Sequence, residues 1–232
     1  MFEFSPEAWM AIELSLRVAT VGTLVGLPIA LVAAYALARW RFPGKIILDG
    51  ILHLPLVLPP VVTGYFLLLT FGRQGTLGKF FYDIFGITFS FRWTGAALAC
   101  GVMGFPLMLR AIRLSFEAID RRLETASGTL GANPYWTFLL VTLPLALPGV
   151  LVGAILCFAK ALGEFGATIT FVSNIPGETQ TIPSAIYTYT QVPGGETEAL
   201  RLSLVSVAIA MVALILSEVL NRRIQKRIAV FE

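Results

Sequence analysis

The side chains that could do chemistry in this chain are few and scattered. The single histidine, His53, has no carboxylate, cysteine or second histidine within its own apolar stretch, 51–71, so a packing role is expected for it. The apolar stretches contain no Ser/His or paired-Asp arrangement of the kind used in nucleophilic or acid–base catalysis. We therefore expect no catalytic residue, no metal ligand and no bound cofactor.

One glycine-rich stretch, 72–79, superficially matches a phosphate-binding loop. The spacing from Gly72 to Gly78 is one residue longer than the motif allows, and Phe80 stands where a serine or threonine would hold magnesium. An ordinary turn is the expected structure. Any ATP hydrolysis on which this chain depends must therefore come from another protein.

Glu164 is the acidic residue with the clearest functional potential. It follows an apolar stretch and lies between Gly163 and Gly166. A carboxylate at such a boundary is costly unless it is hydrated or paired, and Lys160 is placed to pair with it on a helix. Two interpretations stay open: Glu164 is part of a gate, or it forms an ion pair at the edge of the apolar segment.

The composition indicates a membrane protein. Apolar residues make up 56% of the 232 residues and charged residues only 13%, whereas soluble domains carry about 25% charged residues. Stretches of about 20 apolar residues can cross a bilayer, and we predict an all-α bundle of about five spans in a single domain, 1–232. The predicted spans are 14–38, 49–71, 93–112, 137–161 and 200–220.

Further features refine this bundle. The run 165–175 is short and partly polar, which predicts a re-entrant or interfacial element. Prolines within or beside the spans predict kinked helices. Two small-residue faces, Gly22/Gly26 and Gly149/Gly153, allow close helix contact, either within one subunit or across a dimer.

The distribution of Lys and Arg sets the expected orientation. With the N-terminus outside and the C-terminus inside, the inner segments hold eleven of the seventeen basic residues, as the positive-inside rule requires. The basic residues then flank spans and contact lipid headgroups, so we expect no nucleic-acid partner. This orientation places the loop 113–136 in the cytoplasm.

The loop 113–136 is predicted to form a helix, a sharp turn and a second helix. Gly131 can end the first helix, and Asn133 and Pro134 can begin the next one. Apolar residues at helical spacing predict one stripe on the first helix: Ile112, Phe116, Ile119, Leu123 and Ala126. The loop either docks against a partner or lies flat on the lipid headgroups.

The spacing from Ala126 to Gly131, then to Val141 and Leu143-Pro144, resembles the EAA loop of the membrane subunits of binding-protein-dependent ATP-binding-cassette importers. Two departures exist: the family's acidic position is Thr125 here, one residue after Glu124, and Ser127 replaces a second alanine. The resemblance implies that this loop seats in a groove of a cytoplasmic ATPase. The implied coupling residues are Glu124, Thr125, Ala126, Ser127, Gly131, Ala132, Leu143 and Pro144.

The stretches 53–62, 105–113, 162–171 and 174–183 resemble the molybdate permeases of such importers, and sulfate permeases share the core of 163–167. The resemblance implies the MetI-like fold of a type I permease in the bacterial inner membrane. It also implies a homodimer, two ATPase subunits and a periplasmic or extracellular molybdate-binding protein. The candidate gate or translocation path comprises Gly163, Glu164, Phe165, Gly166 and Thr168.

The expected function is therefore that of a permease subunit, not an enzyme, for molybdate and, as a close mimic, tungstate. A sulfate or thiosulfate permease is the alternative. An ion-coupled secondary transporter is less favoured, because the chain lacks evident inverted repeats and charged residues at the middle of the spans.

Overall fold

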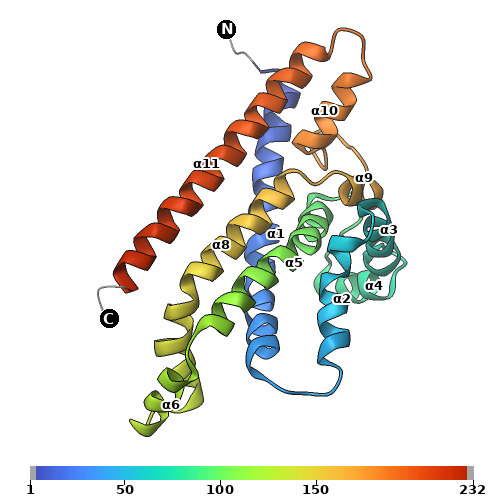
Figure 1. The fold of residues 1–232 in the computed structure, drawn as a ribbon. Helices are drawn as coiled ribbons and strands as arrows, with labels where there is room; N and C mark the ends of the chain where they lie inside the picture. The colour runs from blue at the N-terminus through green and yellow to red at the C-terminus, as the bar shows by residue number, and fades with distance from the viewer. Residues whose placement is uncertain (1–3, 229–232) are drawn as a thin grey trace.

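The computed structural model describes residues 4–228, and this part of the chain is helical without strands (Figure 1). The prediction of an all-α bundle is confirmed. The elements are α1 (Pro6–Arg39), α2 (Lys45–Val57), α3 (Pro60–Phe71), α4 (Thr76–Phe85), α5 (Trp93–Ala118), α6 (Arg121–Thr129), α7 (Pro134–Thr137), the π-helical turn η1 (Phe138–Thr142), α8 (Leu143–Leu162), α9 (Gly166–Val172), α10 (Ile182–Thr190) and α11 (Glu196–Ile228).

Within the described residues, four helical segments are long and apolar enough to cross a membrane, and a bent pair, α2 with α3, could supply a fifth crossing. The four segments are Pro6–Arg39, Trp93–Ala118, Pro134–Leu162 and Glu196–Leu220. From Trp93 to Arg113, α5 rises about 30 Å, which equals the thickness of the hydrocarbon core of a bilayer. The run 165–175 holds only the short helix α9.

The predicted span 49–71 is not one straight helix. It consists of α2 and α3, which meet at an angle of 116°. The cause is local: two successive prolines follow Leu58, and a residue before proline avoids the helical region. Leu58 is accordingly extended, with ψ at 145°, and Pro59 follows with ψ at 134°. The prolines therefore produce a sharp break here rather than a mild kink.

The centre of the bundle is formed by α1, α5 and α8, which approach one another at glycines. A Cβ atom on Gly22 of α1 would lie 2.6 Å from the Ala97 carbonyl oxygen of α5. A Cβ atom on Gly153 of α8 would lie 2.9 Å from the Met108 carbonyl oxygen of α5. Both small-residue faces therefore pack within the subunit, because only glycine allows these backbones to come so close.

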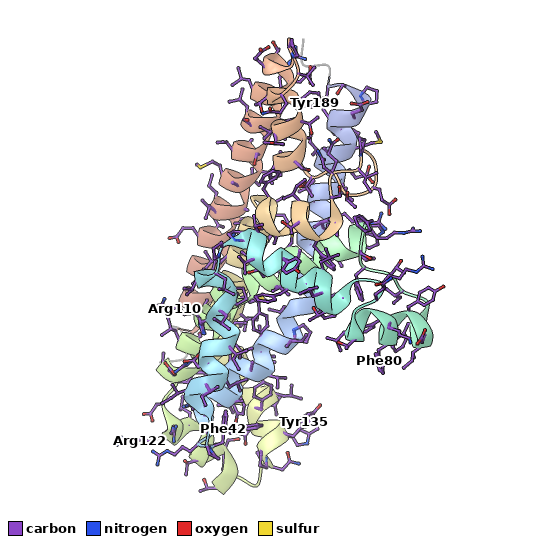
Figure 2. The ribbon with its side chains drawn as sticks, turned by 90° about the vertical axis from the view of Figure 1, so that its right-hand side faces the viewer. Phe42, Phe80, Arg110, Arg122, Tyr135 and Tyr189 are labelled. Atoms are coloured by element: carbon purple, nitrogen blue, oxygen red, sulfur yellow. The ribbon has the colours of Figure 1, made fainter. Side chains whose placement is uncertain are left out.

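The two ends of the bundle differ. The start of α1 lies at the end that carries α10, whereas α6 lies at the opposite end, toward which α11 runs (Figure 1). Figure 2 shows the same separation, with Tyr189 at one end and Arg122 and Tyr135 at the other. The arrangement fits an odd number of crossings. Which end faces the cytoplasm stays a prediction from the distribution of basic residues.

Substitution of Gly22 by valine is expected to destabilise the bundle by about 1–3 kcal/mol, because the new side chain would overlap the α5 backbone. Thermal unfolding of the purified subunit in detergent measures this. The control is Gly50→Ala on α2, where a Cβ atom meets nothing within 4 Å. Equal unfolding temperatures for the two variants would contradict the role given to Gly22.

Candidate functional site

The segment 120–137 forms a helical hairpin, α6 with α7, whose turns follow the predicted signals. The Asp120 carboxylate caps α6 by accepting a hydrogen bond from the Arg122 amide at 2.9 Å. Gly131 turns the chain with φ at +92°, in the left-handed region that favours glycine. Asn133 caps α7 by accepting a hydrogen bond from the Trp136 amide at 3.0 Å, and Pro134 is the first residue of α7.

The apolar stripe predicted for one helix is divided between two. The helix α5 ends at Ala118 because Ile119 is extended, with ψ at 126°, and α6 begins at Arg121. Ile112 and Phe116 are 0% exposed and belong to the bundle core. Leu123 instead lies on the exposed hairpin. The prediction of a single continuous stripe was wrong, because periodicity does not reveal a break in the backbone.

The hairpin presents apolar side chains to its surroundings. Leu130, at the tip, is 89% exposed, and Tyr135 and Trp136 are more than half exposed. Thr125, Ala126 and Gly131 are also exposed. Exposed aromatic and apolar residues concentrated on a projecting element are typical of a docking surface. Whether an ATPase occupies this surface stays a prediction.

Glu124, expected among the coupling residues, has its carboxylate turned toward the bundle. Its Oε1 lies 3.0 Å from Arg39 Nη2 at the end of α1. The same oxygen accepts a hydrogen bond from Thr142 Oγ1 at 3.1 Å. A second link joins Ser127 Oγ to Thr137 Oγ1 at 3.1 Å. The two contacts of Glu124 fix the orientation of α6 relative to α1 and η1, whereas the Ser127–Thr137 bond joins α6 to α7 within the hairpin.

Leu143 and Pro144 lie at the base of the hairpin, at the start of α8, rather than at its tip. Pro144 has no amide hydrogen, so it cannot continue the regular α-helical bonding. The Leu143 amide donates instead to the Phe138 carbonyl, which produces the π-helical turn η1. The proline therefore marks where the hairpin joins α8. Ala132, between the tip and α7, is partly buried.

The second candidate site is the buried carboxylate of Glu164, which is 1% exposed. Its Oε2 pairs with Lys160 Nζ at 2.5 Å, as the spacing suggested. Its Oε1 accepts a hydrogen bond from the Ala167 amide at 3.0 Å, within the first turn of α9. Glu164 therefore holds the end of α8 and the start of α9 together, which supports the ion-pair interpretation; a gating role stays a prediction.

The remaining candidate gate residues lie around α9. Gly166 packs against α3, where a Cβ atom would lie 2.7 Å from the Pro60 Cβ. Thr168 Oγ1 donates a hydrogen bond to the Phe165 carbonyl at 2.9 Å, and the Phe165 ring lies 5.3 Å from the Tyr187 ring. Gly163 is the C-terminal cap of α8. The structure thus brings the predicted residues together and places them against the break between α2 and α3.

Three neighbours of the candidate residues were not predicted from the sequence: Asp49, Arg39 and Thr142. His53 does have a carboxylate nearby: its Nδ1 lies 3.3 Å from Asp49 Oδ1, one helical turn earlier. Arg39 and Thr142, which bind Glu124, carried no sequence signal, because they are distant from Glu124 along the chain. An arginine at the end of a span is explained equally well by the positive-inside rule.

Replacement of Glu164 by alanine is expected to lower the free energy of unfolding by about 3 kcal/mol, because the Lys160 ammonium and the Ala167 amide would lose their partner. Thermal unfolding of the purified subunit measures the loss. The control is Glu178→Ala, since Glu178 lies 3.9 Å from Arg92 in a pair whose side chains are 39% and 63% exposed, and exposed pairs contribute about 0–1 kcal/mol. Similar losses in both variants would contradict the assigned role.

Comparisons with known proteins agree with this architecture. The family model described as "Binding-protein-dependent transport system inner membrane component" matches residues 26–230. The "Molybdenum transport system permease protein ModB" of Escherichia coli (strain K12) is 58% identical over 219 residues, which cover 94% of this chain and 96% of that protein.

Two solved structures share the fold. A chain of the inward-facing MetNI methionine ABC transporter has a TM-score of 0.65 at 18% identity, covering 94% of each chain. A chain of a bacterial alginate ABC transporter, in complex with an alginate pentasaccharide-bound periplasmic protein, has a TM-score of 0.74 at 17% identity, covering 96% of this chain and 81% of that one. The predicted MetI-like permease fold is confirmed. This chain belongs to the family of inner membrane components of binding-protein-dependent transport systems.

Proposed function

We propose that this chain is the membrane-spanning permease subunit of an ATP-driven importer that carries molybdate, with tungstate as a close mimic, across the bacterial cytoplasmic membrane. The observation that carries the proposal is the 58% identity, over nearly the whole chain, to a protein named for molybdenum transport. Sulfate or thiosulfate is the alternative cargo, because these anions resemble molybdate in charge and shape.

The charges of the predicted spans suit a conduit that binds its cargo weakly. Arg17 stacks over the Trp93 ring at 3.9 Å, and Lys160 is paired with Glu164. These two cations are therefore engaged by the protein itself, and the other basic residues of the predicted spans, Arg110 and Arg201, lie close to the ends of theirs. Weak binding favours conduction, since a tightly held anion would not be released. Recognition of molybdate is then delegated to a periplasmic binding protein, in keeping with a family whose transport depends on binding proteins.

The energy would come from two cytoplasmic ATPase subunits, one for each copy of this chain in a homodimer. The hairpin α6–α7 is the element suited to reach them, because it projects from the bundle and exposes Leu130, Tyr135 and Trp136. ATP binding would displace the hairpin, and the helices would move between inward-open and outward-open arrangements. In this proposal the permease itself hydrolyses no ATP and binds no cofactor.

The proposal is tested by uptake in bacteria that lack their own molybdate permease but retain the matching ATPase and binding protein. Expression of this chain is expected to restore accumulation of molybdate at limiting external concentration, and excess sulfate is expected not to compete. If excess sulfate abolishes the restored accumulation, the transported anion is sulfate rather than molybdate. Uptake that persists without the ATPase would favour an ion-coupled transporter instead.

Replacement of Leu130 by aspartate is expected to weaken the binding of the ATPase to the permease about thirtyfold, because the most exposed leucine of the hairpin would be lost from a docking surface. Binding of the purified ATPase to the permease in lipid nanodiscs measures the effect. Leu130→Met keeps the apolar surface and serves as the control. Unchanged affinity in the aspartate variant would mean that the tip does not dock.

A further inference from the structure

One guanidinium joins three helices at the base of the hairpin. Arg39 is the last residue of α1, and its side chain is only 8% exposed. Its Nη2 lies 3.0 Å from Glu124 Oε1 on α6 and donates a hydrogen bond to the Ile119 carbonyl oxygen at 3.1 Å. A single nitrogen therefore contacts the end of α5 and the first turn of α6 at once.

The Ile119 carbonyl lies at the elbow between α5 and α6. Ile119 is the C-terminal cap of α5, where carbonyl groups lack intrahelical partners and favour a cation. Asp120 is the N-terminal cap of α6, which begins at Arg121. Arg39 thus contacts both sides of the elbow. Without these contacts, α6 could rotate about the elbow while α5 stayed in place.

The Glu124 carboxylate extends the connection to α8. Its Oε1 also accepts the hydrogen bond from Thr142 Oγ1 at 3.1 Å, and Thr142 is 1% exposed. Thr142 is the last residue of η1 and leads directly into α8. One carboxylate oxygen therefore connects α6 to α1 and to α8, two of the three helices at the centre of the bundle.

Aromatic rings pack together one helical turn before Arg39. The Tyr35 ring, one turn before Arg39, lies 5.4 Å from the Phe116 ring and 5.0 Å from the Phe138 ring. These rings come from α1, α5 and η1. The Arg39 and Glu124 side chains are 8% and 20% exposed, and a charge-assisted hydrogen bond is stronger where water is largely excluded.

We infer that Arg39, Glu124, Thr142 and the Ile119 carbonyl form a transmission joint, and that Arg39 is a positioning residue of the transport cycle. The Arg39 joint carries a displacement of α6 to α1 and α8, so that the motion is not lost in bending at the elbow. This inference rests on the proposed function. It assigns Glu124 to the permease's own machinery, whereas the exposed Thr125 and Leu130 lie on the docking surface.

The test uses the complete complex of permease, ATPase and binding protein in proteoliposomes. The variants are Arg39→Gln, Glu124→Gln, both together, and Arg41→Gln as the control, which removes an exposed arginine two positions away. Three quantities are measured: affinity of the ATPase for the permease, ATP hydrolysis, and molybdate imported per ATP hydrolysed. A variant that is only less stable lowers import and ATP hydrolysis together, so a lower ratio of the two indicates a loss of coupling.

We expect Arg39→Gln and Glu124→Gln each to lower molybdate import per ATP about tenfold, with unchanged affinity for the ATPase. The double variant should fall no further than either single one, because both side chains act through the same bond. If Arg39→Gln does not accumulate in the membrane, the same ratio is measured for Thr142→Val instead. It removes only the hydroxyl donor, and we expect it to lower the ratio about threefold.

Three results would overturn the inference. Arg39→Gln could match Arg41→Gln, the losses of the single variants could multiply in the double variant, or Glu124→Gln could lose affinity for the ATPase, which would place Glu124 at the docking surface. A wild-type complex that imports neither molybdate nor sulfate would instead remove the proposed function, and the joint with it.

Discussion

The fold depends on one constraint, the close approach of α1, α5 and α8. Lipid offers no hydrophobic gain when helices associate, so tight van der Waals contact must hold them together. Glycines supply that contact: Gly22 lies against the α5 backbone, and a Cβ atom on Gly104 of α5 would lie 2.9 Å from the Cys157 carbonyl oxygen of α8. The other helices are arranged around this centre.

The tightly packed centre connects the hairpin α6–α7 to the segment around α9. At one end, Arg39 and Thr142 tie the hairpin α6–α7 to α1 and α8. Farther along α8, Glu164 connects that helix to α9, which packs against α3. Close-packed helices move as units rather than deforming continuously. In the proposed transport cycle, a movement of the hairpin is carried along α8 to the segment around α9.

The features that the sequence predicted well are those with local causes. Long apolar stretches, the left-handed turn at Gly131 and the cap at Asn133 are determined by neighbouring residues. The features that it missed depend on distant partners or on backbone geometry. The pairing of Glu124 with Arg39 joins residues far apart in the chain. The break at Leu58 was visible as prolines, but its 116° angle was not.

The most direct test of the account is ATP hydrolysis by this chain reconstituted in lipid with its ATPase and binding-protein partners, titrated with molybdate and separately with sulfate. We expect molybdate-loaded binding protein to stimulate hydrolysis and sulfate to leave the rate unchanged. Stimulation by sulfate alone would keep the mechanism but change the cargo. If the three proteins form no complex and neither anion changes the rate, the coupling mechanism is contradicted.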